Sequence, residues 1–243
     1  MAARTEIIVL SPHLDDAVLD CCDHILTWKR NRLPVRVLTV FTFFSNRILS
    51  PWTRWYSQAS GHQPIKEIER IRTCEDAKAM SILGVLWNHL GFIDAGFRSN
   101  EGEPLYPDMK TIFSGIVSPY DTSLLSQLRR SIISFRNCSQ FLVPLGIGKH
   151  VDHILVRKAA EQAIGPGGLC YYVDYPYALS GRNWTINHVA RVVTAKKSIK
   201  WMTKEKRRLL SIYSSQTPLL FGSIRFYPEI ILNPKDRPTE FEL

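Results

Sequence analysis

The segment SPHLDDAVLD, residues 11–20, decides the fold, because it joins the apolar run EIIVL at residues 6–10 to a stretch with helical spacing of apolar residues. This pattern predicts a buried strand that turns into a helix. Polar side chains at such a junction face a crevice, and the start of the helix offers free N–H groups. We therefore take His13, Asp15 and Asp16 as candidate site residues.

These three residues supply two metal-binding side chains and one further carboxylate. An imidazole and one aspartate can bind a metal, while the other aspartate transfers a proton. A purely structural alternative is that one aspartate caps the helix, where N–H groups and the helix dipole stabilise a carboxylate.

The rest of the chain alternates apolar runs with helical patterns. Strands are predicted at residues 35–44, 85–92, 140–145 and 169–179. Helices are predicted over residues 65–83 and 122–135, from about Asp152 onward, and over 203–214 with Thr203 as N-cap. The alternation predicts an α/β fold with a largely parallel sheet and right-handed crossovers, and we expect a single domain over 1–243. Residues 45–64 read as an irregular segment, either a lid or a surface excursion, and the tail as coil with one short strand.

A second polar group, HVDH at residues 150–153, follows the apolar run FLVPL at 141–145. Side chains beyond the carboxyl ends of parallel strands meet in one crevice, so we expect this group to approach residues 13–16. Together the two groups offer the N and O donors of a catalytic zinc site plus an acid–base group. The alternative is that His150 and His153 simply begin a helix without a metal.

Two further residues are of interest, Arg72 as a candidate for substrate binding and Asp94 for its position at a strand end. Arg72 lies on the edge of the apolar stripe of the 65–83 helix, and it either faces substrate or pairs with Glu75. Asp94 follows the 85–92 strand, again at a carboxyl end.

Composition restricts the kind of protein. The formal net charge is +9, and much of the excess lies in residues 191–208, which form either a solvated helix face or a surface for an acidic partner such as a phosphate-bearing substrate. Nucleic-acid motifs are absent, and no apolar run is long enough for a membrane span or a signal peptide. We expect a cytoplasmic protein whose five cysteines are buried and reduced.

Several motifs carry a resemblance to a known family. The chain resembles the LmbE-like, or PIG-L, deacetylases over roughly residues 6–222, in the branch whose first motif is Asp-Asp-Ala. The motifs are SPHLDDAVLD, RTCEDAKAMSILGV, LGFIDAGF, LYPD, PLGIGKHVDH, VDYPYA and YSSQTPLLFGS. The resemblance implies a Rossmann-like three-layer sandwich. It also implies metal-dependent hydrolysis, usually with Zn²⁺, of an N-acetyl group on an amino sugar or glycoside.

The resemblance also implies roles for single residues. His13, Asp16 and His153 correspond to the metal ligands, and Asp15 corresponds to the general base. His150 corresponds to the residue that stabilises the oxyanion, with Asp152 tuning it, and Arg72 and Asp94 lie at positions near the substrate. Leu14 and Ala17 depart from the usual Pro and Glu; the first loosens the turn, and the second concerns substrate class rather than metal binding.

The expected function is therefore removal of an acetyl group from a small N-acetylated sugar or related metabolite. The alternatives are hydrolysis of another acyl or non-sugar amide, and a non-catalytic glycan- or anion-binding protein. The same ligand set also suits Fe²⁺, and oligomeric state is left open.

Overall fold

The computed structural model describes residues 6–47, 49–136, 139–180, 202–221 and 229–234. Most of the basic segment 191–208 lies outside these residues. No helix in the described ranges is long and apolar enough to cross a membrane.

Six strands form one sheet in the order β3-β2-β1-β6-β7-β8. The pairings from β3 to β7 are parallel, and β8 runs antiparallel to β7. The strands are β1 (Glu6–Ser11), β2 (Val35–Phe43), β3 (Leu86–Ile93), β6 (Ser139–Pro144), β7 (Leu169–Tyr172) and β8 (Ile231–Leu232). The predicted mostly parallel sheet is confirmed, and so is the short strand in the tail.

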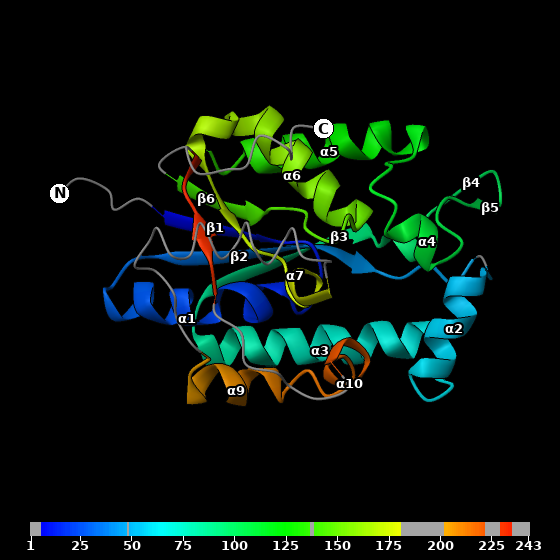
Figure 1. Cartoon of the computed structure of the whole chain (residues 1–243), viewed down its shortest axis with the longest axis horizontal. Coiled ribbons are helices and arrows are strands. Elements are labelled where there is room, and N and C mark those ends of the chain that lie inside the picture. Colours follow the sequence, from blue (N-terminus) through cyan, green and yellow to red (C-terminus); the bar gives the residue numbers. More distant parts are fainter. Residues whose placement is uncertain (1–5, 48, 137–138, 181–201, 222–228, 235–243) are drawn as a thin grey trace.

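Helices cover both faces of the sheet, which gives a three-layer sandwich (Figure 1). Helices α5 and α6 pack together on one face; α1 and α3 cover the other, with α9 against α1. The bounds are α1 (Asp16–Arg30), α3 (Ile65–Leu83), α5 (Thr122–Ile133), α6 (Val151–Ile164) and α9 (Lys204–Leu210). The predicted Thr203 cap is confirmed, because its side chain accepts the Lys206 N–H.

Shorter elements gather around the carboxyl ends of the strands. They are α2 (Pro51–Ala59), η1 (Ala95–Phe97), the hairpin β4 (Ser99–Asn100) and β5 (Glu103–Pro104), α4 (Met109–Ile112), η2 (Pro119–Asp121), α7 (Tyr177–Ser180) and α10 (Thr217–Phe221). The turn η3 (Pro166–Gly168) instead connects α6 to the amino end of β7. In Figure 1, α2, α4 and the hairpin lie together at one end of the molecule.

Helix α2 corrects the prediction that residues 45–64 are irregular. Ser50 accepts the Thr53 N–H, and the Thr53 hydroxyl in turn accepts the Ser50 N–H, which forms a capping box ahead of Pro51. Proline at the first helical position is compatible with a helix start, because that N–H has no partner inside the helix anyway.

The inward face of α3 also differs from the prediction. Helical spacing from Ile68 would put Ile82 on the buried stripe, yet Ile82 is 48% exposed, whereas Met80 and Leu83 are buried. The buried face carries three polar residues, Arg72, Glu75 and Asp76, which find partners there and so displace the apolar stripe. Among the cysteines, Cys74 lies exposed on the outer side of this helix, which corrects the expectation that all are buried.

The topology places the site. The chain leaves β1 toward one face of the sheet and β6 toward the other, so a crevice opens between the carboxyl ends of these neighbouring strands.

Candidate metal centre

The turn between β1 and α1 is held by its own side chains. Ser11 Oγ accepts the Ala17 N–H and donates to the His13 carbonyl, while Asp16 Oδ2 accepts the His13 N–H at 2.8 Å. Asp15 occupies the N-cap position of α1, yet its side chain makes no capping hydrogen bond. The structural alternative for Asp15 is therefore wrong, and its carboxylate is left to face the crevice.

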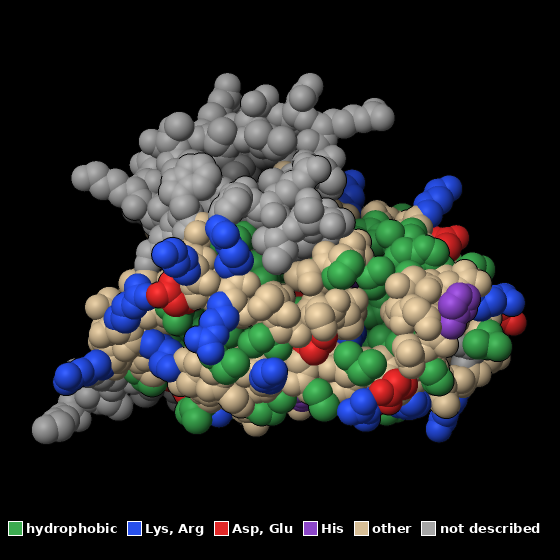
Figure 2. Space-filling model, turned by 90° about the horizontal axis from the view of Figure 1, so that it is seen from below, with side chains coloured by type: hydrophobic (Ala, Val, Ile, Leu, Met, Phe, Trp, Pro, Cys, Tyr) green, Lys and Arg blue, Asp and Glu red, His purple; other side chains and the backbone are tan. Residues whose placement is uncertain are grey.

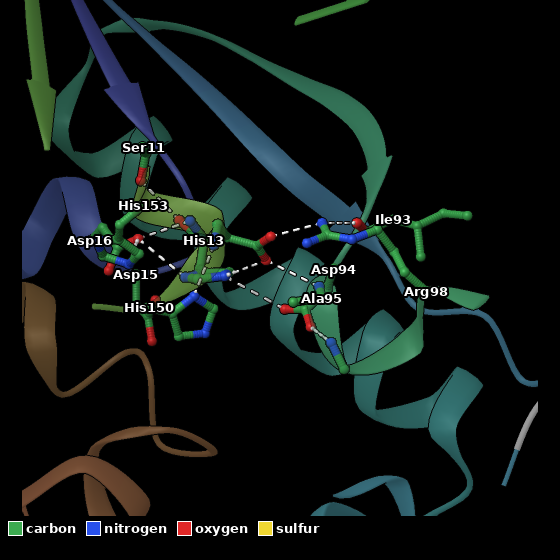
Figure 3. Close-up of polar contacts among 12 residues, drawn as sticks. Ser11, His13, Asp15, Asp16, Ile93, Asp94, Ala95, Arg98, His150 and His153 are labelled. Atoms are coloured by element: carbon green, nitrogen blue, oxygen red, sulfur yellow. Dashed lines mark hydrogen bonds and ion pairs between the residues drawn. The ribbon is translucent and has the colours of Figure 1, made fainter. Parts of the chain in front are cut away.

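His13, Asp16 and His153 converge, as the strand topology predicts (Figure 3). All three are buried, and their donor atoms lie within 4.8 Å of one another. Asp16 Oδ2 is 3.4 Å from His13 Nδ1 and 3.5 Å from His153 Nε2.

One atom of this group indicates a ligand. His153 Nε2 is buried and makes no hydrogen bond to the described residues. Buried polar atoms are nearly always paired, so an orphan nitrogen aimed at a carboxylate fits a metal ligand. Two imidazole nitrogens and one carboxylate oxygen are the donors of many catalytic zinc sites, so these residues fit a divalent cation.

Both imidazoles carry a carboxylate on their far nitrogen. His13 Nε2 lies 3.1 Å from Asp152 Oδ2, and His153 Nδ1 lies 2.6 Å from Asp174 Oδ1. Such carboxylates fix which nitrogen faces a metal and make it more basic. The arrangement directs His13 Nδ1 and His153 Nε2 toward Asp16.

Asp152 is itself held by several donors. Arg98 Nη1 lies 2.6 Å from Asp152 Oδ1, and the Ala95 N–H donates to Oδ2. Burial opposes ionisation, but the Arg98 guanidinium and His13 outweigh it and hold the pKa of Asp152 well below its usual range. Toward His150, Asp152 donates its backbone N–H to Nδ1, so the tuning role predicted for the carboxylate stays a prediction.

That N–H contact sets the tautomer of His150. With Nδ1 accepting a hydrogen bond, the proton of the neutral ring belongs on Nε2. Burial, together with the neighbouring His13, lowers the pKa of His150 well below its ordinary value, which favours this neutral form.

Asp15 faces Arg72 rather than the helix. Arg72 Nη2 is 3.4 Å from Asp15 Oδ2, and Nη1 donates to the Tyr56 hydroxyl at 3.0 Å. Burial raises the pKa of Asp15 to about 6, with Arg72 opposing the shift. Glu75 instead accepts hydrogen bonds from Ser214 and Ser215, so the alternative of an Arg72–Glu75 pair is not the observed arrangement.

A cavity of about 250 Å³ opens over this floor. Arg72 and Asp94, the two residues predicted near substrate, both line it. Asp94 Oδ1 accepts the Gly96 N–H, and its other oxygen lies 3.6 Å from His13 Nε2. The cavity floor also contains His13, Asp15, Asp16 and His150.

A family comparison accounts for this arrangement. The family model described as PIG-L: GlcNAc-PI de-N-acetylase matches residues 8–164, which contain every predicted site residue. The chain belongs to the PIG-L family.

Named relatives of this PIG-L protein are deacetylases. The 2'-N-acetylparomamine deacetylase of Streptomyces fradiae is 27% identical over 224 residues, covering 88% of this chain and 74% of that one. The enzyme of the same name from Niallia circulans is 28% identical, covering 88% and 81%. Among solved structures, the zinc-inhibited form of teicoplanin deacetylase Orf2 superposes with a TM-score of 0.71 at 25% identity, covering 90% of this chain and 87% of that one.

Sequence reasoning missed three polar residues of this PIG-L site: Asp174, Arg98 and Tyr56. Asp174 could have been predicted from the sequence, because it follows strand β7 just as Asp94 follows β3. The rule that residues after strand ends meet in one crevice applies to both. Arg98 and Tyr56 have no such signal, since they enter through a 3₁₀ turn and through a helix that was read as irregular.

Proposed function

We propose that the protein is a metal-dependent hydrolase that removes an N-acetyl group from a small amino sugar or glycoside. One observation carries the proposal: the unpartnered, buried His153 Nε2 lies beside His13 and Asp16, and these two residues line the floor of a cavity that also exposes Asp15. The deacetylase relatives support the choice of reaction.

His13, Asp16 and His153 would hold the cation, and Asp152 and Asp174 would fix the two imidazoles from behind. When bound, a divalent cation polarises a carbonyl and makes water more acidic. We infer zinc because of the donor set, and Fe²⁺ is the second choice.

Asp15 acts as the general base. Its carboxylate lies in the cavity and is not used for capping, and Arg72 favours its ionised, oriented form. Asp15 accepts a proton from the water that attacks the acetamide carbon, which forms the new C–O bond.

His150 stabilises the oxyanion that this attack creates. Its Nε2–H is the free donor of the neutral ring, because Nδ1 is occupied by the Asp152 N–H. When the C–N bond breaks, the proton held by Asp15 passes to the leaving nitrogen with assistance from His150, and acetate and the free amine depart. Asp94 and Arg72 contact the substrate around the reacting group.

The test is acetate release by metal-stripped protein that has been reloaded with Zn²⁺ or Fe²⁺ in separate samples. We expect acetate and a free amine from N-acetylglucosamine or its glycosides with at least one metal, and none from the stripped protein. Hydrolysis of other acyl amides but not acetamides would replace this function with a different amidase. Glycan binding without any hydrolysis in the loaded protein would contradict catalysis.

A further inference from the structure

The wall of the cavity differs sharply from its floor. Of the lining residues that the structure describes, the acidic and basic ones lie on the floor. The wall is built mainly from aromatic and aliphatic side chains. Those of the wall include Trp52, Trp55, Met109, Phe113, Tyr177 and Leu219.

The wall contains a continuous run of aromatic rings. Phe97 meets Tyr56 edge-on at 6.1 Å between ring centroids, and Tyr56 stacks on Trp52 at 5.6 Å and 13°. Trp52 in turn lies 5.0 Å from Trp55. The run begins with the buried Phe97 and ends at Trp55, which is 44% exposed. We call Trp52 and Trp55 the indole platform.

The Trp52 half of the platform is held in place before any ligand arrives. Residue 96 is glycine, and a Cβ there would lie 1.9 Å from Trp52 Nε1, so the indole packs directly on the backbone. The backbone N–H of Trp52 donates to the Pro107 carbonyl, and the Ser50 capping box fixes the start of the helix. A fixed ring loses little conformational entropy when a ligand stacks on it.

The polar groups of Tyr56 and Gln216 on the wall already have hydrogen-bond partners, and the Trp52 Nε1 atom is buried against the backbone rather than open to the cavity. The Tyr56 hydroxyl accepts from Arg72 and contacts Gln216, and the Gln216 amide donates to Ser215. A second sugar or an ammonium group would have to give up its hydrogen bonds to water on entering this part of the cavity. The described residues of the wall offer no carboxylate to replace them, so its binding there would cost free energy. In Figure 2, which views the molecule from below, hydrophobic side chains gather toward the right. This is the side on which Figure 1 places α2.

We propose that the natural substrate carries a planar aromatic group on the sugar that bears the acetamide, and that the indole platform binds this group. The inference rests on the proposed deacetylase function. The aromatic group of the substrate adds one more ring to the run formed by Phe97, Tyr56, Trp52 and Trp55, in the offset or tilted geometry that aromatic pairs prefer.

The test compares the phenyl, cyclohexyl and methyl glycosides of N-acetylglucosamine on the metal-loaded protein. The wild type should show a kcat/KM for the phenyl glycoside roughly tenfold or more above that of the methyl glycoside, with cyclohexyl between them. Trp55→Ala should reduce the phenyl-to-methyl ratio to near one, and Trp55→Phe should restore most of it. Tyr120→Ala, an exposed aromatic outside the cavity, should leave both rates unchanged.

Calorimetric binding of the same glycosides supplies a readout that does not need turnover. Equal affinities and rates of the wild type for the phenyl and methyl glycosides, or a phenyl-to-methyl ratio that Trp55→Ala does not change, would overturn the platform. Acetate release from either compound would still support the deacetylase function. Preferential phenyl binding that depends on Trp55, without acetate release, would instead support the platform and contradict the deacetylase function.

Discussion

At the scale of single residues, chemically equal groups of the site have different partners. Asp15 and Asp16 are adjacent in sequence, but Asp16 accepts the His13 N–H and faces two imidazoles, whereas Asp15 faces Arg72. A coordinated carboxylate is a poor proton acceptor, so this division is what a metal hydrolase requires.

Replacement of Asp15 by asparagine should preserve the metal and abolish most turnover. The amide keeps the shape of the side chain but cannot accept the proton, so kcat should fall by roughly 10²- to 10⁴-fold. Metal content by mass spectrometry and acetate release measure the two effects. His13→Ala is the matched comparison and should lose the metal itself; a near-normal rate in Asp15→Asn would assign the base elsewhere.

Asp174→Asn should weaken the metal site without touching a proposed ligand. The two oxygens of Asp174 accept three N–H groups, from His153, Gly146 and Ile147, whereas an amide offers a single oxygen. Metal affinity should fall about 10- to 100-fold in chelator competition. Glu101→Gln, at an exposed carboxylate, should not change it, and equal affinities in Asp174→Asn would rule out the orienting role.

The predictable part of the site lay next to strands. Residues 13–16 and 150–153 follow apolar runs, so the rule that strand ends meet placed them together before any contact was known. The remainder depends on contacts between segments far apart in the chain. The pairing of Arg98 with Asp152 is one example, because neither local spacing nor composition encodes it.

At the scale of elements, helix α2 is the instructive case. The segment 45–64 that contains it is rich in Ser, Trp and Pro, which indicates a loop by composition, yet the local order Ser50–Pro51 followed by Thr53 is a helix start. The inner side of α2 then packs on Phe97 and α3, so tertiary contacts stabilise a helix of weak intrinsic propensity.

Ser50→Ala should destabilise this element. Removal of the hydroxyl leaves the Thr53 N–H without its acceptor, which costs about 1 kcal/mol in the free energy of unfolding. Chemical denaturation of the two proteins measures the difference. Ser126→Ala, at an exposed position within α5, should show no loss, and an unchanged stability in Ser50→Ala would mean that packing alone holds α2.

At the scale of the whole molecule, a buried charge cluster ties the C-terminal part of the chain to α1. Glu229 accepts the Asp23 N–H, both the ring and backbone N–H of His24, and the Lys206 ammonium at 2.8 Å. Burial alone would raise the pKa of Glu229, but Lys206 and His24 outweigh it and lower the pKa to about 2.

This cluster should make stability depend on pH in the acid range. The unfolded chain binds a proton at Glu229 near its ordinary pKa of 4.5, whereas the folded protein does so only near 2. The stabilisation is therefore complete above pH 4.5 and is lost as pH falls toward 2, and it amounts to on the order of 3 kcal/mol. In acid titrations of stability, the gap between wild type and Glu229→Gln should close over that window. Glu205→Gln, on the exposed side of α9, should parallel the wild type throughout, and a constant gap for Glu229→Gln would refute the cluster's role.

His13, in the turn after β1, and His153, in the first turn of α6, bring their imidazoles to one point, so a cation bound there would close most of the chain into a loop. Such a cation binds the folded state and not the open chain, and at a concentration 1,000 times its Kd it adds about 4 kcal/mol by mass action. Chelation should therefore lower Tm, and titration with Zn²⁺ should restore it in proportion to the logarithm of free metal; a Tm indifferent to chelator would argue against the site. Metal supply would then govern how much of this protein persists in its folded form, as well as how fast it works.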